Sequence, residues 1–159
     1  MKFLKIILSA LILAATISSC KEDRPTLQPP GSKLEGINAT FELYEVSQVD
    51  ELTLSFNKER DVTAAFLGTN PGTITFDSEN FTYSVEANDS PNYLGTEGTW
   101  AFDDNEFPTM ITLNTSDGRT LELPMLATIR PQDQHLKFML TKSCNGETNL
   151  SYKYNFKRQ

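Results

Sequence analysis

Apolar and polar residues alternate with a period of two along most of the chain from Gly36 onward. This period is typical of strands that bury one face, and the number and spacing of the runs predict an all-β sandwich or barrel. The phase changes inside the first run, between Leu43 and Tyr44, which predicts a β-bulge there. The predicted strands cover residues 41–46, 52–56, 74–76, 81–85, 100–102, 111–113, 121–125, 136–140 and 150–156.

Turn-forming residues separate these runs. Asp117-Gly118 and Asn145-Gly146 are dipeptides preferred in type I′ turns, in which both central residues take positive φ. Polar segments at 77–80 and 103–106 separate two other pairs of runs. We therefore expect consecutive strands to pair as hairpins in an antiparallel meander.

One segment does not alternate. Residues 61–67 read Asp-Val-Thr-Ala-Ala-Phe-Leu, and Asp61 can cap a short helix that Gly68 and Pro71 end. The sequence has no internal repeat of solenoid length and no second block of composition. We therefore expect one β domain at residues 36–159, with one short helix.

The first residues have the features of a secretory signal. Lys2 and Lys5 precede an apolar run at 6–15 that is broken only by Ser9. A membrane-spanning helix needs about 20 apolar residues, so this run is too short to span a membrane and is typical of a signal-peptide core. We exclude it from the fold.

Residues 17–20, Ile-Ser-Ser-Cys, resemble a bacterial lipobox. The resemblance implies that signal peptidase II cuts before Cys20, so that residues 1–19 are a lipoprotein signal peptide. It also implies that fatty acyl groups such as palmitate are attached to Cys20. We expect no cofactor other than this covalent lipid, which anchors the chain to a membrane. An ordinary signal peptide with a chance cysteine is the alternative.

Lys21, Glu22 and Asp23 follow the cysteine and resemble the surface-export signal of Bacteroidetes lipoproteins. The resemblance implies an outer-membrane location on the cell-surface side, and a plain linker start with a periplasmic-side location is the alternative. Residues 20–35 comprise the lipidated cysteine and a proline-rich tether. Its residues 21–33 reach roughly 40 Å at ~3.1 Å per residue.

Charge narrows the range of partners. The net charge is −7, and removal of residues 1–19 takes away two lysines and no acid, which leaves 12 basic and 21 acidic residues and a net charge of −9. An acidic body repels phosphate backbones and anionic lipid headgroups. We therefore expect no nucleic acid partner and expect the membrane contact to come from the lipid.

Titratable residues offer little for catalysis or metal binding. One histidine, His135, and two cysteines rule out a His/Cys metal cluster within one copy of the chain. Asp103, Asp104 and Glu106 offer oxygen ligands for calcium, but their spacing is not that of an EF-hand loop, and we favour a solvated hairpin tip. We expect no catalytic residue, no metal site and no enzymatic activity.

Two further motifs point to a family. Residues 39–43, Ala-Thr-Phe-Glu-Leu, and 95–102, Gly-Thr-Glu-Gly-Thr-Trp-Ala-Phe, together with the lipobox, tether and short helix, resemble the uncharacterised lipocalin-like lipoproteins of Bacteroidetes. The resemblance covers the layout of residues 36–159. It implies a lipocalin-like antiparallel β-barrel of roughly eight to nine strands and no particular substrate. Phe41 departs from the tryptophan that the family commonly has in its first strand.

Aromatic residues supply the candidate ligand contacts. Tyr93 and Phe107 lie in predicted loops, and Trp100 lies in a predicted strand. Loop aromatics at a barrel mouth can stack on sugars or cap an apolar cavity, so we take these three as ligand-binding candidates for a small apolar or sugar-like ligand. The alternative is a structural or interaction lipoprotein that serves a surface uptake complex or acts as an inhibitor, with an outer-membrane protein as partner. A continuous apolar cavity of about 300 Å³ or more favours the ligand, and a filled barrel favours the partner.

Overall fold

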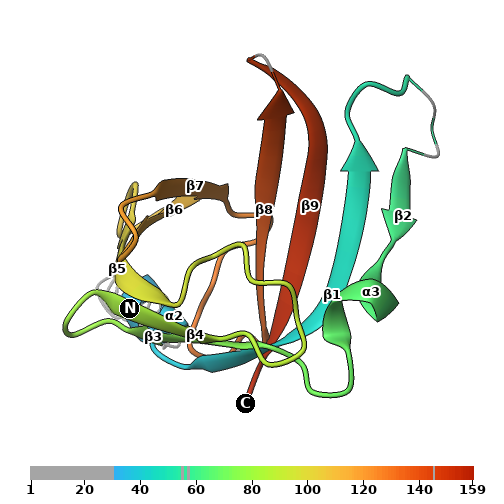
Figure 1. Ribbon diagram of the computed structural model, residues 1–159. Coiled ribbons are helices and arrows are strands. Elements are labelled where there is room, and N and C mark those ends of the chain that lie inside the picture. The colour runs from blue at the N-terminus through green and yellow to red at the C-terminus, as the bar shows by residue number, and fades with distance from the viewer. Residues whose placement is uncertain (1–30, 55, 57, 145) are drawn as a thin grey trace, which may run out of the picture. The chain divides into compact units, whose positions relative to one another are not determined.

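The computed structural model describes residues 31–159 except 55, 57 and 145, and in this part of the chain nine strands form one antiparallel sheet that curls into a nearly closed barrel (Figure 1). The predicted all-β class is confirmed, and the barrel is consistent with a lipocalin-like fold. The strands are β1 (Thr40–Asp50), β2 (Glu59–Asp61), β3 (Thr73–Asp77), β4 (Thr82–Glu86), β5 (Glu97–Phe102), β6 (Met110–Thr115), β7 (Thr120–Pro124), β8 (His135–Cys144) and β9 (Glu147–Arg158).

The strand order is β7-β6-β5-β4-β3-β1-β9-β8, with β2 paired to β1 beside this path. The predicted meander is confirmed from β3 to β7 and the predicted hairpin for β8 and β9, whereas β2 and β3 do not pair. β7 and β8 meet through a single bridge, Met125 to Phe138, beside a hydrogen bond of 2.9 Å from the amide of Leu126 to the carbonyl of Lys137. This narrow seam is where the barrel closes.

β1 pairs with three strands, two of which share one of its edges. Its first residues pair with β3, its last residues pair with β2, and β9 pairs along nearly its whole length. In Figure 1 the far halves of β1, β9 and β8 extend beyond the rest of the barrel. We call the halves of these three strands that extend beyond the barrel, together with β2, the projecting sheet. Its inner face continues the inner wall of the barrel.

The predicted bulge in β1 is confirmed. The pairing of β1 with β9 shifts between Leu43 and Glu45, which leaves Tyr44 as the extra residue. Tyr44 is 53% exposed, whereas Leu43 and Val46 are buried. The bulge therefore keeps both apolar neighbours on the inner face by turning one residue outward.

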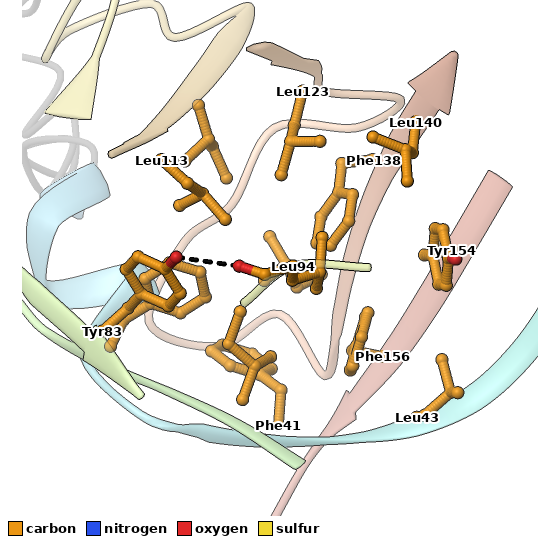
Figure 2. Packing of buried hydrophobic residues seen from close by; sticks show 14 of the residues in the cluster. Phe41, Leu43, Tyr83, Leu94, Leu113, Leu123, Phe138, Leu140, Tyr154 and Phe156 are labelled. Carbon is orange, nitrogen blue, oxygen red and sulfur yellow. Dashed lines mark hydrogen bonds between the residues drawn. The ribbon is translucent and has the colours of Figure 1, made fainter. Parts of the chain in front are cut away.

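Large apolar side chains fill the barrel (Figure 2). Phe41, Phe76, Trp100 and Phe138 are each at most 2% exposed, and Phe76 packs edge-on against both Phe41 and Trp100. Burial of this apolar surface is the main source of stability for the barrel. The other buried hydrophobic residues of the core are Ile37, Leu43, Val46, Phe66, Ile74, Tyr83, Leu94, Ile111, Leu113, Leu123, Ile129, Leu136, Leu140, Tyr154 and Phe156.

The predicted strand at 52–56 is wrong. Leu52, Leu54 and Phe56 are 64%, 104% and 106% exposed, and they lie in the connection between β1 and β2. β1 ends because the Asp50 carboxylate accepts hydrogen bonds from the amide of Leu52 (3.0 Å) and the hydroxyl of Thr53 (2.7 Å) and so fixes a turn. The edge strand is instead the charged β2.

Two helices are present in the described chain. α3 (Thr63–Leu67) matches the predicted helix; Asp61 accepts a hydrogen bond of 2.8 Å from the amide of Thr63, and Gly68 ends the helix at a φ of 57°. α2 (Lys33–Ile37) was not predicted, because prolines and glycine dominate the sequence just before it. Its Ile37 is fully buried in the core, so packing offsets the poor local propensity.

The β6–β7 turn forms where it was predicted but not as type I′. Gly118 has a φ of 86°, whereas Asp117 is not among the residues with positive φ. The hydroxyl of Thr115 donates to the Asp117 carboxylate, and this contact favours the observed turn. Residue 145 lies outside the described residues, so the type of the β8–β9 turn stays a prediction.

Candidate functional site

A loop between β4 and β5, residues 87–96, covers one end of the barrel, and we call it the plug loop. Its Leu94 is 5% exposed and belongs to the core. The hydroxyl of Tyr83 donates to the Leu94 carbonyl at 2.8 Å, as the dashed line in Figure 2 marks. Burial raises the pKa of Tyr83, so this hydroxyl keeps its proton and its hydrogen bond.

The plug loop is also fixed to the segment before β3. The Asp89 carboxylate accepts hydrogen bonds from the amides of Thr69 (3.1 Å) and Asn70 (2.9 Å), and the Ser90 hydroxyl accepts one from the amide of Gly72 (2.8 Å). The cavity between this loop and the barrel wall is about 30 Å³. Small-ligand pockets are about 300–1,000 Å³, so this cavity holds no organic ligand.

Four aromatic rings gather at the same end of the barrel, and we call them the mouth cluster: Phe66, Tyr93, Tyr152 and Tyr154. Phe66 of α3 lies at 5.7–6.3 Å from the three tyrosine rings, measured between centroids. Tyr93 of the plug loop stacks on Tyr152 of β9 at 6.5 Å. The Lys142 ammonium lies 4.1 Å from the Tyr93 ring centroid and 5.5 Å from that of Tyr152.

The three tyrosines of the mouth cluster differ in their exposure to solvent. Tyr93 and Tyr152 are half-buried, so part of each ring faces solvent. Tyr154 is 3% exposed, and its hydroxyl has no hydrogen-bond partner in the described part of the chain. Burial raises the pKa of Tyr154, and the neighbouring tyrosines add to this shift. The cluster thus offers two accessible tyrosines above a buried one.

The structure separates the three ligand candidates from the sequence. Tyr93 belongs to the mouth cluster. Trp100 is 2% exposed and packs in the core, where its indole N–H donates to the Asp77 carbonyl at 3.1 Å. Phe107 is 69% exposed in the β5–β6 loop, and strand directions place that loop at the opposite end of the barrel from the plug loop. These three residues do not form one site.

The predicted attachment residues lie outside the described residues. This applies to Cys20 and to Lys21, Glu22 and Asp23, which fall within residues 1–30. In the part of the chain that the structure describes, no helix is long and apolar enough to cross a membrane.

A hollow of about 430 Å³ lies away from the mouth cluster, over β3, β4 and β5. Its lining includes Asp77, whose carboxylate accepts hydrogen bonds from the amide of Glu79 (2.8 Å) and from the Asn80 side chain (2.7 Å). Asp77 therefore stabilises the turn after β3, and these bonds lower its pKa. The Asp77 carboxylate beside this surface hollow thus has a structural role.

The acidic loop at 103–106 stabilises itself. The Asp103 carboxylate accepts hydrogen bonds from the Thr109 hydroxyl and from the amides of Thr109 (2.9 Å) and Met110 (3.0 Å). These bonds lower the pKa of Asp103 to about 2. Among the described residues no group of three or more His, Cys, Asp or Glu side chains is arranged to hold a metal ion.

His135 lies at the start of β8. Its Nδ1 is 2.8 Å from the Asn155 amide oxygen, and its ring packs edge-on against Tyr44 at 5.6 Å. The Asn155 side-chain N–H in turn donates to Glu45 at 3.0 Å. These contacts hold the imidazole among structural partners on the outer face of the sheet.

The sequence analysis did not identify four residues of the site. Phe66 was assigned to a helix, Tyr152 and Tyr154 to a strand, and Lys142 received no role. The signal for Lys142 was present: it continues the inward positions Leu136, Phe138 and Leu140 and is the first charged residue among them. A charge at an inward position indicates that the strand has left the core.

Comparison of the chain with protein-family models, with curated proteins and with solved structures found no match.

Proposed function

We propose that this chain is a lipid-anchored, non-catalytic binding lipoprotein, similar to the lipocalin-like lipoproteins of Bacteroidetes, displayed on the outer face of the outer membrane. Its ligand is sugar-like and binds at the mouth of the barrel. The observation that supports this site is the mouth cluster, in which Tyr93 stacks on Tyr152 beside Lys142. Tyrosine rings with one accessible edge suit the mixed apolar and polar faces of a sugar.

The filled barrel argues against a ligand held inside it, which favours either a protein partner or a ligand bound at the surface. An apolar ligand requires an interior volume that the core side chains occupy, and the cavity beneath the plug loop is only about 30 Å³. A sugar-like ligand needs no interior volume, because it can lie across exposed rings and polar groups at a surface. The mouth therefore suits a saccharide better than a fatty or apolar molecule.

Native mass spectrometry of the mature chain with a library of defined neutral and acidic oligosaccharides tests this function. Bound saccharide should appear with the parent chain and should be lost with Tyr93→Ala. Tyr44→Ala serves as the matched control, since Tyr44 is an exposed tyrosine outside the mouth cluster. Absence of any bound saccharide, or equal binding by Tyr93→Ala, would refute a saccharide site at the mouth.

A second candidate function is protein interaction, and the exposed apolar loop favours it. Leu52, Leu54 and Phe56 expose large apolar side chains together in one connection. Exposed apolar groups of this kind are typical of contact surfaces. Capture of an outer-membrane protein from intact cells by the parent, and not by Leu54→Ser/Phe56→Ser, would support this role over saccharide binding.

A further inference from the structure

Arg60 differs from the other arginines of the described chain. Arg119 and Arg130 each pair with a carboxylate, and Arg158 donates to two backbone carbonyls. Among the described residues Arg60 forms no salt bridge, and its hydrogen-bonding partner is Gln48. Arg60 is therefore an arginine that, within the described chain, pairs with neither a carboxylate nor a backbone carbonyl.

Gln48 holds the Arg60 guanidinium in place. Gln48 is 7% exposed on the inner face of β1. Its amide oxygen accepts a hydrogen bond from Arg60 Nε at 2.6 Å, and its amide N–H donates to the Tyr152 hydroxyl at 3.1 Å. Arg60 is exposed, and within the described chain its Nη1 and Nη2 make no hydrogen bond. Two guanidinium nitrogens with fixed orientation match the two oxygens of a carboxylate.

These side chains border a hollow of about 240 Å³ on the projecting sheet, which we call the notch. The strand register explains its composition. Arg60, Gln48 and Tyr152 are cross-strand partners in one row, on β2, β1 and β9. The notch is smaller than a typical ligand pocket of about 300–1,000 Å³, so it suits one chemical group of a larger ligand. Its lining residues are Gln48, Asp50, Thr53, Lys58, Arg60 and Leu150.

The other charged groups around the notch have internal partners. Lys58 pairs with Glu51 at 3.2 Å. The Asp50 carboxylate accepts hydrogen bonds from the hydroxyl of Thr53 and the amide of Leu52, and these bonds lower its pKa, as does the nearby positive charge of Arg60. Arg60 is therefore the cation of the notch that forms no salt bridge in the described chain, although its charge acts on Asp50 from a distance.

The notch adjoins the mouth cluster through two shared contacts. Tyr152 belongs to the mouth cluster and receives the Gln48 hydrogen bond. Leu150 lines the notch and pairs across the strands with Lys142, whose ammonium covers the Tyr93 ring. A ligand that enters the notch thus meets an aromatic surface and a second cation beside it.

We propose that the notch binds the carboxylate of an acidic saccharide. Arg60 holds the carboxylate through two parallel hydrogen bonds, and Gln48 is a positioning residue that sets the Arg60 orientation. The sugar ring lies toward Tyr152 and the mouth cluster. This inference rests on the proposed function, and it names the class of saccharide: one with a carboxylate, such as a uronic acid.

Calorimetric titration of the mature chain with methyl glucuronide and with methyl glucoside tests the proposal. The two probes share a ring and differ in the carboxylate. The parent should bind the glucuronide at least tenfold more tightly than the glucoside, and Arg60→Ala should lose this preference. Arg60→Lys should lose most of it, because lysine keeps the charge but lacks the paired nitrogens. Arg130→Ala, an exposed arginine elsewhere, should keep it.

A test of Gln48 must distinguish the positioning of Arg60 from a purely structural role. Gln48→Glu places a carboxylate beside Arg60 and satisfies its charge, so the preference for glucuronide should vanish although the thermal unfolding midpoint is retained. In the parent, glucuronide should shift the ¹⁵Nε resonance of Arg60, and in Gln48→Glu it should not. A glucuronide preference that persists in Arg60→Ala or in Gln48→Glu would overturn the proposal.

Two further outcomes separate this inference from the proposed function. Neutral saccharides that bind at the mouth cluster with no preference for glucuronide would overturn the carboxylate site and leave the proposed function standing. Failure of every saccharide to bind would overturn both. Sodium sulfate that competes with glucuronide at equal affinity would also overturn the proposal, because it would indicate a site for simple anions.

Discussion

Single side chains in this protein mostly stabilise turns and close approaches of strands. Asp50, Asp77 and Asp103 each accept hydrogen bonds from the residues that follow them, and each ends a strand or orders a loop. The sequence predicted turns at Asp77 and Asp103, whereas the turn at Asp50 was not predicted. The particular hydrogen bonds depend on backbone geometry that composition does not specify.

Gly98 is required by the close approach of β5 and β6. A Cβ added at Gly98 would overlap the backbone carbonyl of Asn114, which cannot move without breaking the strand pairing. Gly98→Ala should therefore lower the free energy of unfolding by about 1–3 kcal/mol. Urea unfolding measures this, with the exposed Ala101→Ser in the same strand as control. Equal stability of the two variants would show that the strands can separate at this position.

Asp103 should contribute to the pH dependence of stability. Its pKa in the folded chain is about 2, below the ordinary value of 3.8, so its stabilising effect is complete above about pH 4 and is lost as the pH falls to about 2. The Tm of Asp103→Asn should fall less than that of the parent between about pH 5 and pH 2. Asp117, with a pKa of about 2, keeps some pH dependence in the variant.

Glu106→Gln in the same loop is the control for Asp103. No hydrogen bond to the Glu106 side chain is present in the described chain, so this variant should follow the parent over the whole range. A fall in Tm for Asp103→Asn as steep as that of the parent would contradict a role for Asp103 in acid stability.

At the scale of elements, alternation predicted strands well where each strand had a partner. The runs at 74–76, 111–113 and 136–140 lie within β3, β6 and β8. The run at 52–56 alternates equally well but is an exposed connection, because Asp50 turns the chain away before it can pair. Alternation with a period of two is therefore not sufficient for a half-buried strand, because the run must also pair with a neighbouring strand.

α3 places Phe66 in the mouth cluster. Phe66 is 7% exposed and contacts three tyrosine rings. Phe66→Ala should cost about 3–5 kcal/mol of unfolding free energy. Phe107→Ala, at a residue that is 69% exposed, should change it by less than about 0.5 kcal/mol. Similar effects of the two substitutions, measured by urea unfolding, would contradict the role of Phe66 as the base of the cluster.

For the whole molecule, the sequence predicted the β class, the hairpins and the short helix, but it did not predict the site. Gln48 and Tyr152 are 104 residues apart and meet only because β1 and β9 pair in a particular register. Tyr93 was identified from loop composition, whereas Trp100 and Phe107 lie elsewhere in the fold. Contacts of this range follow from the register of the whole sheet, which single-sequence periodicity does not specify.

Attachment of the chain to the membrane is predicted to depend on Cys20. Cys20→Ala should leave the precursor uncleaved and without fatty acid, because the lipid is attached to that cysteine. Labelling of cells with a clickable palmitate analogue measures this. Cys144→Ala is the matched control and should label like the parent. Equal labelling of Cys20→Ala and the parent would refute the anchor.

The filled barrel is proposed to bind saccharide at its mouth. Amide chemical-shift mapping of the mature chain, during titration with an oligosaccharide identified by mass spectrometry, distinguishes this site from one inside the barrel. We predict shifts at Tyr93 and Tyr152 and unchanged resonances at the core residues Phe41 and Trp100. Shifts centred on Phe41 and Trp100, with none at Tyr93 and Tyr152, would show binding inside the barrel and contradict this account.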